Sequence, residues 1–279
     1  METDALDAMM AMARGAVAAH PGRLCVLGLC GAQGSGKSTL AAALKARMDM
    51  EGCATALLSI DDLYLGRAAR VALARDVHPL LRTRGVPGTH DVAQGLDVIA
   101  RLERGEGALL PRFDKASDDP CPQDRWERAA PDTRLLVLEG WCVGARPQAE
   151  AALAEPVNRL EQSEDSDGRW RRFANAALAG DYQRLFARID RLALLAAPGF
   201  EVVQTWRGEQ EAALRAHAGA AAGVMDDAQV ARFIQHYERL TRHILDEMPA
   251  RADLVIQLAA DRSVVGTVVR AGSWGKLHP

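Results

Sequence analysis

One short segment of the chain combines residue types that bind phosphate groups. It reads GAQGSGKS over residues 31–38, and it lies between an apolar run, RLCVLGLC, and a run with helical spacing, TLAAALKARM. Its glycines let successive backbone N–H groups turn toward phosphate oxygens, and the helix that follows points its positive end at the same charge. Lys37 can then reach the β- and γ-phosphates of a nucleotide, and the Ser38 hydroxyl can coordinate Mg²⁺.

This spacing, between a buried strand and a helix, favours a nucleoside triphosphate site over an ordinary glycine-rich turn. The predicted nucleotide-binding residues are Gly31, Ala32, Gln33, Gly34, Ser35, Gly36, Lys37, Ser38 and Thr39.

Carboxylates follow two other apolar runs. Asp61 and Asp62 come directly after ATALLSI, and Glu139 ends the run LLVLE. In an open α/β sheet, ligands collect beyond the carboxyl ends of the strands, so we expect these side chains near the phosphate-binding segment. One aspartate could accept the proton of a substrate hydroxyl, and Glu139 could hold Mg²⁺ directly or through its water. The competing interpretation is that Asp61 or Asp62 only caps the turn that follows.

The elements that must position these residues can be read from hydrophobic patterns. Nearly continuous apolar runs cover residues 24–30, 54–60, 135–138, 192–197 and 254–258. Such runs are typical of strands covered on both faces. Helical patterns cover residues 4–19, 38–49, 91–104, 203–220 and 227–247. The alternation predicts a three-layer α/β/α fold with a mostly parallel sheet of about five strands.

Three segments lack this periodicity. Residues 65–90 and 111–133 carry Pro, Gly and charged residues, and we interpret them as functional loops. The polar segment 161–172 is interpreted as a mobile surface connection. Because no linker or repeat divides the chain, residues 1–279 are expected to form a single domain with elaborated loops.

Composition limits the partners of the chain. Its 279 residues include 34 basic and 37 acidic ones, which gives no overall field for binding nucleic acid or an anionic membrane. Small-molecule partners are therefore expected, while the oligomeric state stays open. The five cysteines have no metal-binding spacing, and no window is apolar enough to span a membrane. Together these features favour a cytoplasmic protein with reduced thiols.

Six segments in a fixed order carry a resemblance to a known family. The combination of GAQGSGKST, SIDDLYL, LRTRGVPGTHD, PRFDK, LEGWCVG and WRGEQE resembles the D-glycerate 3-kinase-like branch of the P-loop kinases, relatives of uridine kinase, pantothenate kinase and phosphoribulokinase. The resemblance extends from about residue 23 to residue 261. It implies phosphorylation of a small-molecule hydroxyl by ATP with Mg²⁺, and D-glycerate is the first candidate acceptor.

The resemblance also implies roles for individual residues. Asp61 matches the aspartate that acts as base or metal partner in this kinase group, with Asp62 as the fallback. Residues 111–115, PRFDK, resemble a substrate-loop motif of uridine kinases. Arg207, in a lid region at about 200–222, is the best match for an arginine that reaches the transferring phosphoryl group. The arginines of segment 161–172 compete with Arg207, but their acidic neighbours favour a solvated face.

A hydroxy-acid substrate needs a planar cation for its carboxylate and a few hydrogen-bonding groups. The substrate-binding candidates are Asp62, Tyr64, Arg84, His90, Asp91, Arg112, Asp114 and Lys115. Two alternatives stay open. Surface arginines are often only solvated or paired, and His90 with Asp91 could simply begin the following helix.

Taken together, these residues predict transfer of a phosphoryl group with Lys37, Asp61 and Arg207 as the catalytic residues and with Ser38 and Glu139 at the metal. One rival hypothesis is a kinase of the same architecture that uses pantothenate, a nucleoside or another sugar acid. Another is a regulatory module that binds ATP without phosphorylating a small molecule.

Overall fold

A six-stranded sheet forms the centre of the protein. The computed structural model describes residues 2–218 and 225–270. Five strands are parallel and β10 is antiparallel to β9, in the order β10-β9-β8-β1-β7-β2. The strands are β1 (Cys25–Gly31), β2 (Thr55–Ser59), β7 (Leu135–Gly140), β8 (Arg191–Ala196), β9 (Leu254–Leu258) and β10 (Val264–Val269). The five parallel strands are those predicted from the apolar runs.

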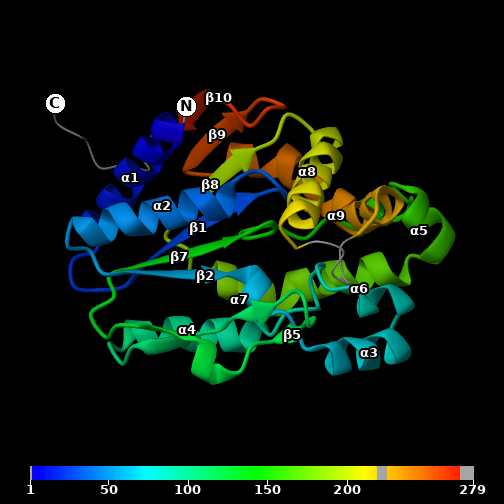
Figure 1. The fold of residues 1–279 in the computed structure, drawn as a ribbon, viewed down its shortest axis with the longest axis horizontal. Helices are drawn as coiled ribbons and strands as arrows, with labels where there is room; N and C mark the ends of the chain where they lie inside the picture. The colour runs from blue at the N-terminus through cyan, green and yellow to red at the C-terminus, as the bar shows by residue number, and fades with distance from the viewer. Residues whose placement is uncertain (1, 219–224, 271–279) are drawn as a thin grey trace.

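Helices cover both faces of this sheet, which gives the predicted three layers (Figure 1). Alternate residues of a strand point to opposite faces. Leu27 therefore packs in a cluster with α1 (Glu2–Ala19) and α2 (Lys37–Met50). Val26 packs on the other face with α4 (Val92–Glu103), α7 (Gln183–Phe186) and α9 (Asp227–Glu247).

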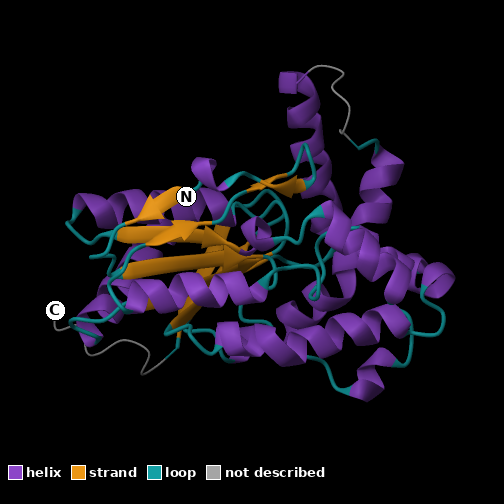
Figure 2. Ribbon diagram, turned by 90° about the horizontal axis from the view of Figure 1, so that it is seen from below, coloured by secondary structure: helices purple, strands orange, loops and turns teal. Residues whose placement is uncertain are grey.

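The strand order brings together the segments that carry the predicted site residues. β1 lies between β7 and β8, so the phosphate-binding segment leaves the sheet beside the ends of β7 and β2. The helix α8 (Glu201–Ala218) follows β8, and Figure 1 shows α8 and α9 beyond the arrowheads of β1 and β7. Figure 2 shows the sheet in one half of the molecule and mainly helices in the other. The carboxyl ends of the strands therefore face a largely helical region.

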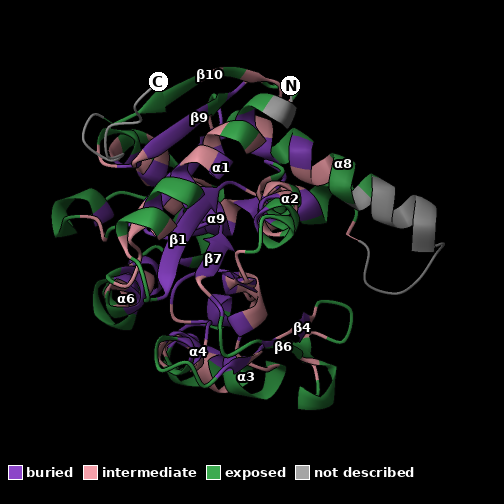
Figure 3. Cartoon of the chain, turned by 90° about the vertical axis from the view of Figure 1, so that its left-hand side faces the viewer, coloured by how far each residue is buried: buried purple, intermediate pink, exposed green. Residues whose placement is uncertain are grey.

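The expected count of about five strands is one too low for the sheet described. The additional strand, β10, pairs with β9 on one side only, and its side chains are mostly exposed, as its green colour in Figure 3 shows. Gly266 and Thr267 interrupt its valines, so β10 leaves no continuous apolar run of the kind that marks the buried strands.

The loops predicted at 65–90 and 111–133 contain regular structure. The first holds the helix α3 (Arg67–Asp76). The second contributes to two small two-stranded sheets, which pair β3 (Ala108–Leu110) with β6 (Glu127–Ala129) and β4 (Phe113–Asp114) with β5 (Asp119–Pro120). Both segments therefore present their side chains from ordered backbone.

The interpretation of segment 161–172 as a solvated connection is wrong. It belongs to α5 (Arg159–Glu164) and α6 (Arg169–Ala177), and Arg171 is buried. The Arg171 guanidinium pairs with the buried Asp165 carboxylate at 3.0 Å and also donates to backbone carbonyls. The polar sequence hid this burial because the buried charges, Asp165 and Arg171, neutralise each other inside the fold.

The remaining predicted helices are confirmed to within a few residues. The predicted lid region, 200–222, is described only as far as residue 218 in α8, and residues 219–222 lie outside the described part of the chain. Among the described helices, none is long and apolar enough to cross a lipid bilayer.

Candidate active site

The phosphate-binding segment forms a tight loop between β1 and α2. Gly34 and Gly36 have φ angles of 78° and 86°, a left-handed conformation that glycine adopts without strain. Gly34 also lies against α8, where an added Cβ would come within 2.5 Å of the Trp206 Cβ. Within the described residues, no side chain caps the start of α2 at Gly36. The first amides of α2 are thus available to bind an anion.

This loop opens into a pocket of about 160 Å³ at the carboxyl ends of β1, β2 and β7. The pocket is lined by Gln33, Gly34, Lys37, Ser38, Ser59, Asp61, Tyr64, Arg84, Lys115, Glu139, Trp141, Arg207, Gln210, Phe233 and Tyr237. The structure therefore gathers the loop, two of the predicted carboxylates and three predicted cations around one space.

Lys37 lies at the first position of α2, inside this pocket. Its ammonium has no hydrogen bond or ion pair with residues 2–218 or 225–270, whereas Lys45 on the same helix pairs with Asp49 at 2.7 Å. Lys37 can therefore meet an anionic ligand without first giving up a protein partner.

The Asp61 carboxylate is held on both of its oxygens. Oδ1 accepts a hydrogen bond from the Tyr64 hydroxyl at 2.8 Å, and Oδ2 pairs with the Lys115 ammonium at 2.8 Å. Burial acts to raise the pKa of Asp61, but the charges of Lys115 and Lys37 and the two hydrogen bonds outweigh it and lower the pKa. Asp61 is therefore an anionic acceptor facing the pocket.

Asp62 has different surroundings. Its Oδ1 accepts from the Phe113 amide at 3.0 Å, and its Oδ2 lies 3.3 Å from the Arg112 guanidinium. Burial raises the pKa of Asp62, although these two partners oppose the shift. Asp62 does not line the pocket, and its contacts tie the end of β2 to the hairpin that carries Lys115.

Ser38 and Glu139 form a pair suited to a hard cation. The Ser38 hydroxyl donates to Glu139 Oε1 at 3.0 Å. Glu139 is buried, and its second oxygen, Oε2, has no hydrogen-bond partner among the described residues. Burying a carboxylate oxygen without a hydrogen-bond partner costs free energy unless a ligand binds it. Oxygen ligands are those that Mg²⁺ prefers. The residues present therefore fit the predicted Mg²⁺.

Three cations besides Lys37 line the pocket. Arg84 pairs with Asp118, and its guanidinium lies 5.7 Å from the centre of the Phe113 ring. Lys115 projects from the β4–β5 hairpin with 59% of its side chain exposed. Arg207, on α8, lies 5.6 Å from the centre of the Phe233 ring.

Besides Asp62, four predicted substrate residues do not line the pocket. Asp91 caps α4 by accepting from the Gln94 amide at 3.0 Å, which is the alternative that the sequence left open. Asp114 accepts from the Ala116 amide and Ser117 hydroxyl and so shapes its own hairpin. Arg112 pairs with Asp62 and Glu127, and His90 is buried behind Tyr64, with the two ring centres 4.5 Å apart.

Three aromatic residues line the pocket although the sequence did not predict them as site residues. The Trp141 indole donates to the Gly85 carbonyl at 3.2 Å, and the Tyr237 hydroxyl donates to the Arg84 carbonyl at 3.1 Å. Phe233 lies beside Tyr237 on α9. Tyr237 and Phe233 follow the apolar spacing of α9, so no local signal distinguishes them from core residues.

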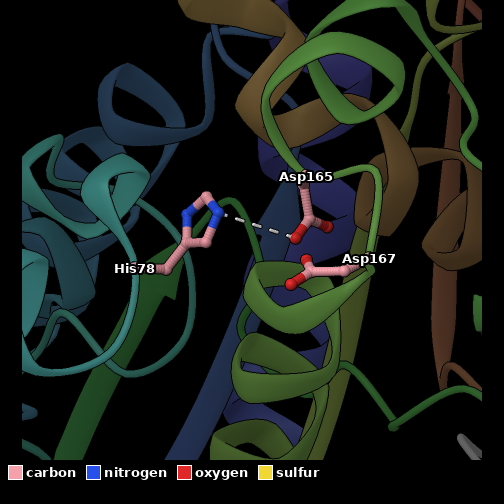
Figure 4. A group of neighbouring side chains, drawn as sticks. All are labelled: His78, Asp165 and Asp167. Atoms are coloured by element: carbon pink, nitrogen blue, oxygen red, sulfur yellow. Dashed lines mark ion pairs between the residues drawn. The ribbon is translucent and has the colours of Figure 1, made fainter.

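One group of potential metal ligands lies away from this pocket in the described part of the chain: His78, Asp165 and Asp167 (Figure 4). His78 Nε2 is 3.8 Å from Asp165 Oδ1. The Asp165 carboxylate already accepts from the Trp170 and Arg171 amides and pairs with the Arg171 guanidinium. Its charge is therefore used to anchor α6, and we assign no metal to this group.

Two buried histidines make the stability of the fold depend on pH. Burial lowers the pKa of both His90 and His236 from 6.5 to about 4. Between these values the unfolded chain binds protons that the folded chain does not, so stability decreases as the pH falls from 6.5 toward 4. The full difference corresponds to about 3 kcal/mol for each histidine. We expect thermal denaturation to show a falling Tm from pH 7 to 4.5 and a smaller fall for His236→Gln; equal falls would contradict the role of His236.

The phosphate-binding loop between β1 and α2, together with a related kinase that is 36% identical, defines a class of protein, the P-loop kinases. An uncharacterized kinase of Schizosaccharomyces pombe, mug58, is 36% identical over 228 residues, which are 77% of this chain and 79% of that protein. The chloroplastic D-glycerate 3-kinase of Arabidopsis thaliana is 26% identical over 223 residues, and the match spans 76% of this chain but 46% of the plant protein.

Among solved structures, the D-glycerate 3-kinase from Cryptococcus neoformans superposes with a TM-score of 0.77 at 24% identity, over 95% of this chain and 99% of that one. No protein-family model matches the sequence. The relationship to the fission-yeast kinase extends over most of both chains, and the chain belongs to the D-glycerate 3-kinase-like P-loop kinases.

Proposed function

We propose that this chain transfers the γ-phosphate of ATP to a hydroxyl of a small hydroxy acid, with D-glycerate as the first candidate. The observation that carries the proposal is the shared pocket: Asp61 faces the same space as Lys37 of the phosphate loop and three other cations. The names of the Arabidopsis and Cryptococcus relatives support the choice of D-glycerate.

The phosphates of ATP bind to the loop amides at residues 31–39, with Lys37 directed at the β- and γ-phosphates. Ser38 and Glu139 would hold Mg²⁺, which neutralises negative charge on the phosphates when it is bound. Arg207 enters the pocket from α8 and stabilises charge on the phosphoryl group as it moves.

Asp61 orients the attacking hydroxyl and accepts its proton. Each of its oxygens accepts one hydrogen bond in the structure, and because a carboxylate oxygen has a second lone pair, the hydroxyl can donate to Asp61 while Tyr64 and Lys115 stay in place. Lys115 is the more exposed partner, and the carboxylate of an acid substrate offers its ammonium a second anion. Lys115 would thus link the carboxylate of the bound acid to Asp61, beside the place where the hydroxyl arrives.

Arg84 supplies the planar cation that a carboxylate can engage through two parallel hydrogen bonds. Its orientation is fixed by Asp118 and by the Phe113 ring. The group that recognises the acid and the group that activates the hydroxyl therefore come from different segments of the chain.

An acceptor panel tests this assignment. We expect ADP release with MgATP to be fastest with D-glycerate and slower with L-glycerate, pantothenate, uridine and glycerol, with a phosphoglycerate as product by mass spectrometry. Faster turnover of pantothenate, a nucleoside or another sugar acid would replace D-glycerate as acceptor and keep the kinase. ADP release that no acceptor accelerates would favour a regulatory ATP-binding module instead.

A further inference from the structure

The side chain of Arg262 makes three contacts that the proposed mechanism does not use. Arg262 lies in the turn between β9 and β10 with a φ angle of 68°, a left-handed conformation that residues other than glycine rarely adopt. Its side chain turns back toward the phosphate loop and α8, and it does not line the active-site pocket. The backbone strain at this residue is compensated by contacts of its side chain.

The first contact fixes the phosphate loop. Arg262 Nε donates to the Gly34 carbonyl at 2.6 Å. Because a peptide unit is planar, the direction of this carbonyl also sets the direction of the Ser35 N–H on the same unit. That N–H points into the loop, where it donates to the Ala32 carbonyl at 3.2 Å. Arg262 therefore holds the loop in its anion-binding shape from outside the pocket.

The other two contacts reach α8. Arg262 Nη2 pairs with Glu209 at 2.6 Å, and its guanidinium lies 5.2 Å from the centre of the Trp206 ring. The Trp206 indole in turn donates to the Ala260 carbonyl at 2.7 Å, which ties α8 to the same turn. Trp206 is fully buried and packs directly under Gly34.

We propose that Arg262 is a positioning residue that couples the phosphate loop to α8 and thereby places Arg207 over the bound phosphates. Arg207 follows Trp206 in the chain, so any rotation of α8 that moves Trp206 also moves Arg207. This proposal rests on the proposed function in one respect, the binding of MgATP to the loop.

Calorimetric titration with MgATP tests whether Arg262 positions the phosphate loop. We expect Arg262→Ala to weaken MgATP binding about tenfold, the effect of losing one charge-assisted hydrogen bond, and Arg262→Lys to recover part of the loss. The matched control is Arg270→Ala, which removes an exposed arginine next to β10 whose guanidinium donates to the Arg251 carbonyl at 3.2 Å. We expect this control to bind MgATP like the unchanged protein.

A double-mutant cycle with Arg207→Ala tests whether Arg262 acts through Arg207, since substitutions of residues that act through one another do not have additive effects. We expect Arg262→Ala to weaken MgATP binding by a clearly smaller factor in the Arg207→Ala background. Equal factors in both backgrounds would reject the coupling to Arg207, and unchanged binding by Arg262→Ala would reject the positioning of the loop.

Two more measurements decide the proposal: MgATP binding by the unchanged protein and the Tm of Arg262→Ala. Absence of MgATP binding in the unchanged protein would reject the proposed function itself. A merely structural role for Arg262 predicts a lower Tm with unchanged affinity at a temperature where the variant is folded, and that outcome also overturns the proposal.

Discussion

Replacing Lys37 by alanine is expected to lower turnover at least about a thousandfold, because it removes the cation that we propose stabilises the transferring phosphoryl group. Lys37 makes no hydrogen bond or ion pair with residues 2–218 or 225–270. Its removal therefore leaves no carboxylate without a bonded partner. The far-ultraviolet circular dichroism and the Tm should stay close to those of the unchanged protein. The measurement is the rate of ADP release with saturating D-glycerate and MgATP.

Lys45→Ala is the matched control for this variant. Lys45 lies on the same helix and pairs with Asp49 outside the pocket, so its loss should leave turnover within about twofold. Similar losses in both variants would point to an effect on α2 as a whole. Full activity of Lys37→Ala would reject the assignment of the loop.

Changing Asp61 to asparagine is expected to reduce kcat by about 10²–10⁴-fold while MgATP still binds. Asparagine keeps the size of the side chain but cannot accept the proton of the hydroxyl. Since Lys115 and Lys37 hold the pKa of Asp61 low, the carboxylate stays ionised and kcat should not fall through its protonation between pH 8 and 5. Single-turnover kinetics and MgATP titration separate the chemical step from binding.

Asp62→Asn provides the comparison for Asp61. Its carboxylate is adjacent in sequence but directed at the Phe113 amide and Arg112, so we expect at most about a tenfold loss, through disorder of the Lys115 hairpin. A normal kcat for Asp61→Asn combined with a large loss for Asp62→Asn would transfer the role of base to Asp62.

The central sheet could be predicted because its five parallel strands are covered on both faces and therefore leave continuous apolar runs in the sequence. Segment 161–172 could not, because burial there depends on charge pairs that form only in the folded chain. Glu161 pairs with Arg239, which lies on α9, and the pattern of either segment alone is that of a solvated surface.

The pocket also contains some features that local sequence predicts and others that depend on contacts between distant segments. Its phosphate loop is a local motif, so the tight turn between β1 and α2 could be predicted from spacing alone, and nucleotide binding by residues 31–39 stays a prediction. The motif PRFDK brings Lys115 into the pocket, but Arg112 and Asp114 of the same motif stabilise the hairpin instead. Trp141 and Tyr237 depend on the packing of distant segments, so their positions follow only from the fold.

The buried pairs Glu161–Arg239 and Asp165–Arg171 have a consequence for the history of this sequence. Losing one partner strands the other charge in the interior, at a cost of about 3–5 kcal/mol, whereas an apolar pair of similar volume is often tolerated. Selection should therefore remove single substitutions at these four positions. An alignment of related chains should show both members of a pair retained or both replaced, with few sequences in between.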